Sequence, residues 1–223
     1  MKLWTYGEAV TKIENELDLQ EEKFISPEEL MGIFNSAIDE AEQMVLGLYE
    51  DYLLAEKTYV LVPGQDRYEM PADIYANKIR YLWFNDNQLR YQIKRTRASI
   101  LPFADIPHSQ YSFQVQHRDA NEGVTVKLSP SVTHSGPYMH MQYIRNANRL
   151  ANDDSVIDLP ESMNFIFAYV KAKVYSKESN PLVQLALADL EAQRAFLQTT
   201  LSSMTVDDDN DIAPDMSFYA DLN

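Results

Sequence analysis

The spacing of apolar side chains divides the chain into two helical ends and a central stretch of strands. Apolar residues recur every three or four positions up to about residue 55, and again from about residue 160 to residue 201, as in helices with a buried face. Between residues 57 and 145 they alternate with polar residues in short runs separated by turns, as in half-buried strands. The predicted order of elements is therefore helices, strands, helices.

Two helix starts are marked near the N-terminus. Thr5 and Glu8 have the spacing of a capping box, in which each side chain bonds a free backbone N–H of the first turn. Ser26, Pro27 and two glutamates mark a stronger start. The apolar stripe that follows predicts a long helix ending near residue 55. Its other face is acidic and is expected to be solvated or to face a basic partner; it carries Asp39, Glu40, Glu42, Glu50 and Asp51.

The central stretch predicts antiparallel sheet with one buried face and one wet face. Pro63-Gly64, Asn85-Asp86-Asn87 and Asn121-Glu122-Gly123 mark turns between strands. Aromatic residues at strand spacing favour core and cross-strand pairs over a sugar or nucleic-acid platform. They are Tyr59, Tyr68, Tyr81, Trp83, Tyr91, Tyr111, Phe113, Tyr138 and Tyr143.

The helical ends are expected to pack together, because each apolar stripe must be covered. A helix after Leu159-Pro160 is apolar on more than one side and is predicted to be mostly buried, and Asn180-Pro181 separates it from a last helix. The predicted fold class is α+β, with an inserted antiparallel β domain and an extended acidic C-terminal arm. The predicted parts are a helical bundle (1–56 and 151–202), the β domain (57–150) and the arm (203–223).

Charge is distributed unevenly over these parts. The net charge of the chain is −15. Residues 1–56 contain 14 acidic and 3 basic side chains, whereas residues 57–150 contain 7 acidic and 12 basic ones. An acidic body binds nucleic acid poorly, since phosphate binding needs clustered Lys and Arg. The basic central segment can instead face the acidic segments of a neighbouring copy.

The arm, residues 203–223, contains six acidic side chains and no basic one, and is not expected to fold alone. A disordered terminus is the plainer interpretation. Apolar side chains spaced through it favour slightly an arm that docks on another chain. The predicted partner-binding residues are Ile212, Met216, Phe218, Tyr219 and Leu222.

Motifs of known chemistry are absent from the sequence. There is no cysteine, no HExxH and no phosphate-binding glycine loop. His108, His117, His134 and His140 lack the spacing of metal ligands, so surface or strand histidines are the favoured interpretation. Asp207, Asp209 and Asp211 match the start of a calcium loop, but Ile212 and Phe218 replace its required glycine and glutamate. No catalytic residue, cofactor or metal site is predicted; a hydrolase with scattered carboxylates is the least favoured alternative.

Several short segments, taken in order, resemble the head-to-tail adaptor (connector) proteins of tailed bacteriophages, also called tail tubular protein A-like or gateway proteins. Trp4 is followed by Pro27-Glu28-Glu29-Leu30 and Asn35-x-Ala37. Residues 62–73, Val-Pro-Gly-Gln-Asp-Arg-Tyr-Glu-Met-Pro-Ala-Asp, are similar to the pattern G-Q-x-x-Y-x-L-P-x-D, with Met70 in place of leucine. Tyr143-Ile144-Arg145 and Leu159-Pro160 complete the series, over about residues 4–200.

The resemblance implies a non-enzymatic virion protein of the neck or tail, made in the host cytoplasm. Its expected partners are the portal protein, tail or nozzle proteins, and further copies of itself in a closed ring of roughly twelve, with DNA passing through without specific binding. We expect no membrane association, since no apolar run approaches a membrane span. Alternatives are another neck or tail-tube protein, and an aromatic-lined β domain that binds surface glycans.

Overall fold

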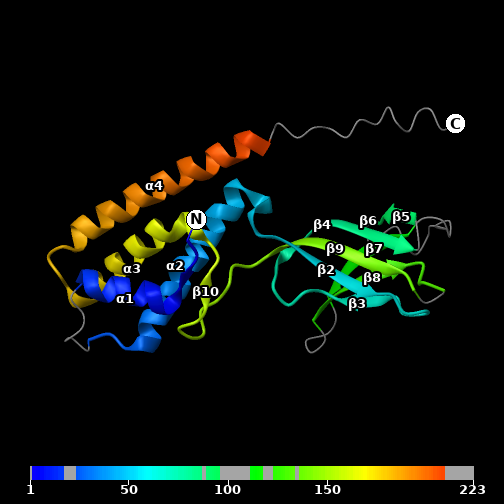
Figure 1. Cartoon of the computed structure of the whole chain (residues 1–223), viewed down its shortest axis with the longest axis horizontal. Coiled ribbons are helices and arrows are strands. Elements are labelled where there is room, and N and C mark those ends of the chain that lie inside the picture. Colours follow the sequence, from blue (N-terminus) through cyan, green and yellow to red (C-terminus); the bar gives the residue numbers. More distant parts are fainter. Residues whose placement is uncertain are drawn as a thin grey trace. The chain divides into compact units, whose positions relative to one another are not determined.

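The computed structural model describes residues 2–17, 24–86, 89–95, 111–117, 123–133 and 136–208. It contains four α-helices and several antiparallel strand pairs within these ranges, which confirms the α+β fold class. The chain forms two compact units (Figure 1). Unit 1 consists of Met1–Glu50 and Ala147–Asn223, and unit 2 of Asp51–Asn146. Unit 2 is thus an insertion within the sequence of unit 1.

Four helices build unit 1. Helix α3 contacts α1, α2 and α4, and α4 also contacts α2 (Figure 1). A two-residue antiparallel pair, β1 with β10, joins the start of α1 to the segment before α3. The elements are β1 (Trp4–Thr5), α1 (Tyr6–Leu17), α2 (Pro27–Leu48), β10 (Val156–Ile157), the 3₁₀ turn η2 (Pro160–Ser162), α3 (Met163–Glu178) and α4 (Val183–Asp208).

Both predicted helix starts are confirmed. The Thr5 hydroxyl accepts from the Glu8 N–H at 3.3 Å, and the Glu8 carboxylate accepts from the Thr5 N–H at 3.2 Å. The Ser26 hydroxyl accepts from the Glu29 N–H at 3.2 Å. The predicted end of the long helix near residue 55 is wrong, because Tyr49 leaves the helical conformation after Leu48 and a 3₁₀ turn, η1 (Glu50–Leu53), follows.

The core of unit 1 lies around α3, which buries eight side chains and is covered on several sides as predicted. Phe34 of α2 and Phe165 of α3 are both buried, and Tyr6 contacts Phe34 edge to face at 5.4 Å between ring centroids. Helix α4 buries Leu190, Leu197 and Leu201. It continues to Asp208, so residues 203–208, which the sequence assigns to the arm, are helical.

The described residues of unit 2 form two four-stranded sheets. The first sheet has the order β2-β9-β4-β5, and the second has the order β3-β8-β7-β6. Neighbouring strands are antiparallel, except that β6 and β7 are parallel, contrary to the prediction. The strands are β2 (Leu54–Val60), β3 (Arg67–Glu69), β4 (Ile74–Asp86), β5 (Leu89–Gln92), β6 (Lys94–Arg95), β7 (Ser112–His117), β8 (Val124–Ser129) and β9 (Tyr138–Arg145).

The two sheets share one core. The buried side chains of the first sheet include Phe84 of β4 and Met139 and Met141 of β9. They cluster with Phe113 of β7 and with Val126 and Leu128 of β8 in the second sheet. Alternate residues of β9, such as Tyr138, face away from this core. Unit 2 is therefore a sandwich in which each sheet has an inner face and an outer face.

A bulge in β4 changes which aromatic residues are buried. Ile79 pairs with Tyr143 of β9. Tyr81, two residues further along β4, pairs with Gln142, which is directly adjacent to Tyr143. Strand β4 therefore contains one extra residue at this point. Ile79 therefore packs against the core, while Tyr81 points outward and is 57% exposed. The prediction that the strand aromatics are core residues is wrong for Tyr81 and for Tyr138, which is 45% exposed. Regular alternation does not account for the extra residue before Tyr81, and Tyr138 occupies an outward position of β9.

Candidate interaction surfaces

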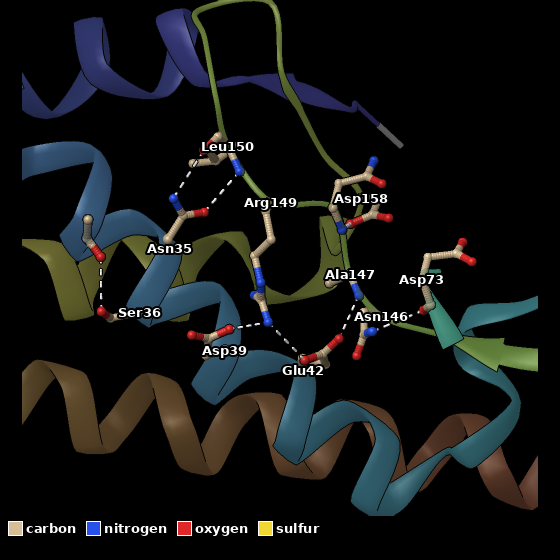
Figure 2. Close-up of polar contacts among 12 residues, drawn as sticks. Asn35, Ser36, Asp39, Glu42, Asp73, Asn146, Ala147, Arg149, Leu150 and Asp158 are labelled. Carbon is tan, nitrogen blue, oxygen red and sulfur yellow. Dashed lines mark hydrogen bonds and ion pairs between the residues drawn. The ribbon is translucent and has the colours of Figure 1, made fainter. Parts of the chain in front are cut away.

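A polar network fixes the segment by which the chain re-enters unit 1 (Figure 2). Asn35 of α2 accepts from the Leu150 N–H at 2.9 Å and donates to the Leu150 carbonyl at 3.1 Å. Its side-chain amide therefore binds the backbone of Leu150 as a neighbouring strand would. Asn35 belongs to the Asn-x-Ala motif of the resemblance, and Ala37 of the same motif is buried.

Glu42, about two turns further along α2 than Asn35, binds the same segment. Its carboxylate accepts from the Ala147 N–H at 2.5 Å and contacts the Arg149 guanidinium at 3.4 Å (Figure 2). Arg149 also pairs with Asp39. Glu42 is buried, so its charge is compensated by these donors rather than by water.

The acidic face of α2 is predicted to be solvated or to face a basic partner, and Glu42 and Asp39 do the second, since both contact Arg149. Glu40 pairs with Arg194 of α4, within the same unit. In unit 2, Asp51 pairs with Arg80. The basic partners of several of these acids lie in their own chain, because a helix face that looks uniformly polar in sequence is covered by distant segments in the fold.

In unit 2, two of the segments that resemble phage adaptor proteins, residues 62–73 and 143–145, contact each other. Asp73, from the Pro-x-Asp end of the first motif, accepts a hydrogen bond from the Tyr143 hydroxyl at 3.0 Å. The Asn146 side chain donates to the Asp73 carbonyl at 3.0 Å. Burial and the adjacent Asp73 carboxylate raise the pKa of Tyr143 to about 12, so this hydroxyl stays protonated and donates. The contact ties the start of β4 to the end of β9.

The first part of the same motif, Gly64-Gln65-x-x-Tyr68, closes a turn. The Tyr68 hydroxyl donates to the Gln65 carbonyl and accepts from the Val62 N–H, each at 3.3 Å. The Gln65 side chain donates to the Arg67 carbonyl at 2.7 Å. Gly64 has φ +79°, a conformation that favours glycine. The motif residues therefore shape the backbone, and none is placed as a catalytic group.

One exposed apolar surface runs along α4. The α4 stripe consists of Leu182, directly before the helix, and of Leu185, Ala192 and Phe196, with the carboxylate of Asp189 at the helical position between Leu185 and Ala192. Leu185 is 69% exposed and Phe196 is 61% exposed. The buried side chains Leu190, Leu197 and Leu201 lie on a different face. Helix α4 is therefore apolar on two sides, which is unusual for a helix with only one covered face.

A second exposed apolar surface is the outer face of the first sheet. Val60 of β2 pairs directly with Tyr138 of β9, and both are exposed. Beside them, the Trp83 ring stacks on the His140 ring at 5.2 Å between centroids and 13° between planes. With Tyr81, these residues form the sheet patch: Val60, Tyr81, Trp83, Tyr138 and His140.

The polar groups within the sheet patch have partners on the same face. The Nδ1 atom of His140 lies 3.0 Å from the Thr58 hydroxyl and 3.2 Å from the Glu56 carboxylate. Thr58 and Trp83 both pair with His140 across the ladder, one on each side. The imidazole is thus fixed by polar contacts at Nδ1 and by stacking on Trp83, which gives the patch a defined conformation.

The predicted arm residues Ile212, Met216, Phe218, Tyr219 and Leu222 lie outside the described residues, as do His108 and His134. Among the side chains that the structure describes, no group of three or more His, Asp or Glu residues is placed to hold a metal ion. None of the described helices is long and apolar enough to cross a membrane. The described surface thus offers apolar contact areas and structural polar networks.

Comparison with known families supports the resemblance to phage adaptor proteins. The model of the SU10 adaptor protein family matches residues 4–217, which is nearly the whole chain. The chain belongs to this family. As an SU10 adaptor protein it is a structural component of a phage virion that interacts with other head or tail proteins, and the predicted resemblance to phage head-to-tail adaptors is confirmed. None of the curated proteins compared with the chain matches it.

Proposed function

We propose that this SU10 adaptor protein is one subunit of a closed ring, of roughly twelve copies, that joins the portal to the tail and encloses part of the DNA exit channel. The observation that carries the proposal is the family match over residues 4–217, which covers both units and most of the arm. In this proposal the helical bundle, which includes α4 up to Asp208, the β domain and the segment after Asp208 have distinct roles. The motif residues maintain the fold, and exposed apolar surfaces make the contacts.

The charge distribution supports a channel through which DNA slides. Unit 1 contains 25 acidic and 8 basic residues, a formal net charge of −17. A lumen bordered by carboxylates repels phosphates and prevents the genome from adhering to the wall. Unit 2, with 9 acidic and 11 basic residues, lacks this bias. We therefore place part of unit 1 at the lumen.

The direct test is electron microscopy of the purified protein mixed with the portal protein of the same phage. Rings stacked coaxially on the portal are expected, and their symmetry gives the copy number. The protein alone is an inadequate sample, since an adaptor subunit can remain monomeric until a portal organises it. If portal and adaptor remain separate at high concentration, the portal-ring proposal fails, and another neck or tail-tube role takes precedence.

The arm is proposed to dock on the portal or on a neighbouring subunit through Ile212, Met216, Phe218, Tyr219 and Leu222. Ending the chain at Asp208 keeps α4 whole and removes these side chains. We expect weaker assembly on the portal for this variant. A full-length control with the five apolar residues changed to serine separates loss of apolar contacts from loss of chain length. Normal assembly of both variants would contradict the arm proposal and leave the ring proposal standing.

A further inference from the structure

Exposed apolar side chains are concentrated on two surfaces of the described chain, one in each unit. Among the residues that the structure describes, twelve large hydrophobic side chains are exposed. Four belong to α4 or directly precede it, and four lie on the first sheet. They are Leu182, Leu185, Leu187 and Phe196 in unit 1, and Leu54, Val60, Tyr81 and Tyr138 in unit 2. Scattered apolar residues need no explanation, whereas grouped ones indicate interaction sites.

The composition of α4 is that of a helix whose two opposite sides are both covered by protein. From residue 183 to residue 204 the helix has only three charged side chains, Asp189, Glu191 and Arg194. Arg194 is engaged with Glu40 and Glu191, so it does not need water as its partner. One side of α4 packs on α2 and α3. The stripe on the other side therefore forms a second contact surface, built from Leu182, Leu185, Ala192 and Phe196.

The sheet patch is also suited to contact another protein. It lies on a paired and hydrogen-bonded sheet, so ordering it on binding costs little conformational entropy. The His140 ring has partners from Glu56, Thr58 and Trp83, so covering it buries no unsatisfied ring nitrogen at Nδ1. Exposed Tyr and Trp side chains are enriched in the centres of protein interfaces. Tyr81 and Tyr138 are exposed here, and the partly exposed Trp83 lies beside them.

The charges of the two units identify the partner. Two different apolar surfaces on one chain are what a head-to-tail contact between identical subunits requires, because each copy offers one surface and receives the other. Contact between two α4 stripes would bring together two units of net charge −17. Contact between a stripe and a sheet patch brings −17 against +2 and avoids this repulsion.

We infer that the α4 stripe of one copy packs on the sheet patch of the next copy, and that this contact, repeated, closes the ring. The inference rests on the proposed ring and names the surfaces that build it. It also gives the inserted sandwich a role, because unit 2 carries the surface that receives the neighbouring subunit. Disrupting either surface should therefore prevent ring closure while leaving each unit folded.

Cross-linking in the cysteine-free chain tests the contact directly. We would introduce Leu185→Cys and Val60→Cys together, assemble the protein on the portal and treat it with a short bismaleimide. A ladder of covalent oligomers up to the ring size is expected. Each single variant should give no ladder. Gln198→Cys with Val60→Cys is the matched control, since Gln198 is an exposed residue of α4 away from the stripe.

The outcomes of this experiment distinguish failure of the inferred contact from failure of the proposed ring. Portal-bound rings of the Leu185→Cys, Val60→Cys variant that give no ladder would overturn the inference while the proposed function stands. Dimers from Leu185→Cys alone would show stripe-to-stripe contact and also overturn it. If the unmodified chain forms no rings on the portal, the proposed function and the inference fall together.

A second pair of variants tests the same contact without a cross-linking reagent. Phe196→Asp should raise the concentration needed for half-maximal ring assembly by about tenfold or more, since it places a charge in an apolar contact. Gln198→Asp adds the same charge to the same helix and should leave assembly unchanged. Circular dichroism establishes that both variants are folded. Equal assembly of the two variants would refute the stripe as a contact surface.

Discussion

Replacing Glu42 by alanine should destabilise unit 1 far more than its place on an acidic helix face suggests. The substitution removes the acceptor of the buried Ala147 N–H, which is 2.5 Å from the Glu42 carboxylate. A buried donor left without a partner costs about 1–3 kcal/mol. The lost contact with Arg149 adds about 1 kcal/mol at most, because Arg149 is half-exposed and keeps Asp39. We expect a total loss of about 1–4 kcal/mol.

Two variants bracket this prediction. Glu42→Gln keeps a side-chain oxygen for Ala147 but loses the charge, so we expect about half the loss of Glu42→Ala. Glu40→Ala is the matched control, because it removes the same side chain two residues away on α2. Its partly exposed pair with Arg194 should contribute less than about 1 kcal/mol.

The free energy of unfolding is measured by urea titration with a reporter confined to unit 1. The chain has two tryptophans, Trp4 in unit 1 and Trp83 in unit 2. A Trp83→Phe background leaves Trp4, which packs edge to face on Phe167 at 5.3 Å and should change its fluorescence on unfolding. If Glu42→Ala and Glu40→Ala have the same urea midpoint, the reasoning about the buried carboxylate is refuted.

Two further predictions concern a helix cap and alkaline pH. Ser26→Ala removes the acceptor for the Glu29 N–H and should cost unit 1 about 1 kcal/mol, seen as a lower midpoint in thermal circular dichroism; an unchanged midpoint would contradict the capping role. Burial raises the pKa of Tyr6 and Tyr143 from 10.0 to about 12, so both hydroxyls stay protonated in the folded chain while they ionise near pH 10 in the unfolded chain. Stability should therefore be fully retained below pH 10 and fall between pH 10 and pH 12, and urea midpoints across this range that do not fall would exclude this effect.

Local signals explain how much of the fold is predictable from the sequence. The caps at Thr5 and Ser26 act within one turn of the chain, so their residues suffice to locate the helix starts. The alternation of β9, with Met139 and Met141 inside and Tyr138 outside, follows directly from the pleat of a strand. The motif residues Asp73 and Tyr143 are recognisable as a pattern, although their mutual contact is visible only in the fold.

Features that depend on distant segments could not be predicted in this way. The single inserted residue in β4 reverses the face of Tyr81, and only pairing with β9 shows it. The α4 stripe and the sheet patch likewise depend on which faces other elements cover, since Phe196 and Leu197 are both apolar but only Leu197 is buried.

Period and caps in the sequence determined the type and order of the elements, because these depend on neighbours along the chain. Only the tertiary structure decided the role of Glu42, which looks like a surface carboxylate on α2 but is buried and holds Ala147, 105 positions away. The physical reason is that burial and hydrogen-bond partners are properties of packing. A carboxylate is stable in the interior only where distant donors converge on it, and sequence spacing does not record that convergence.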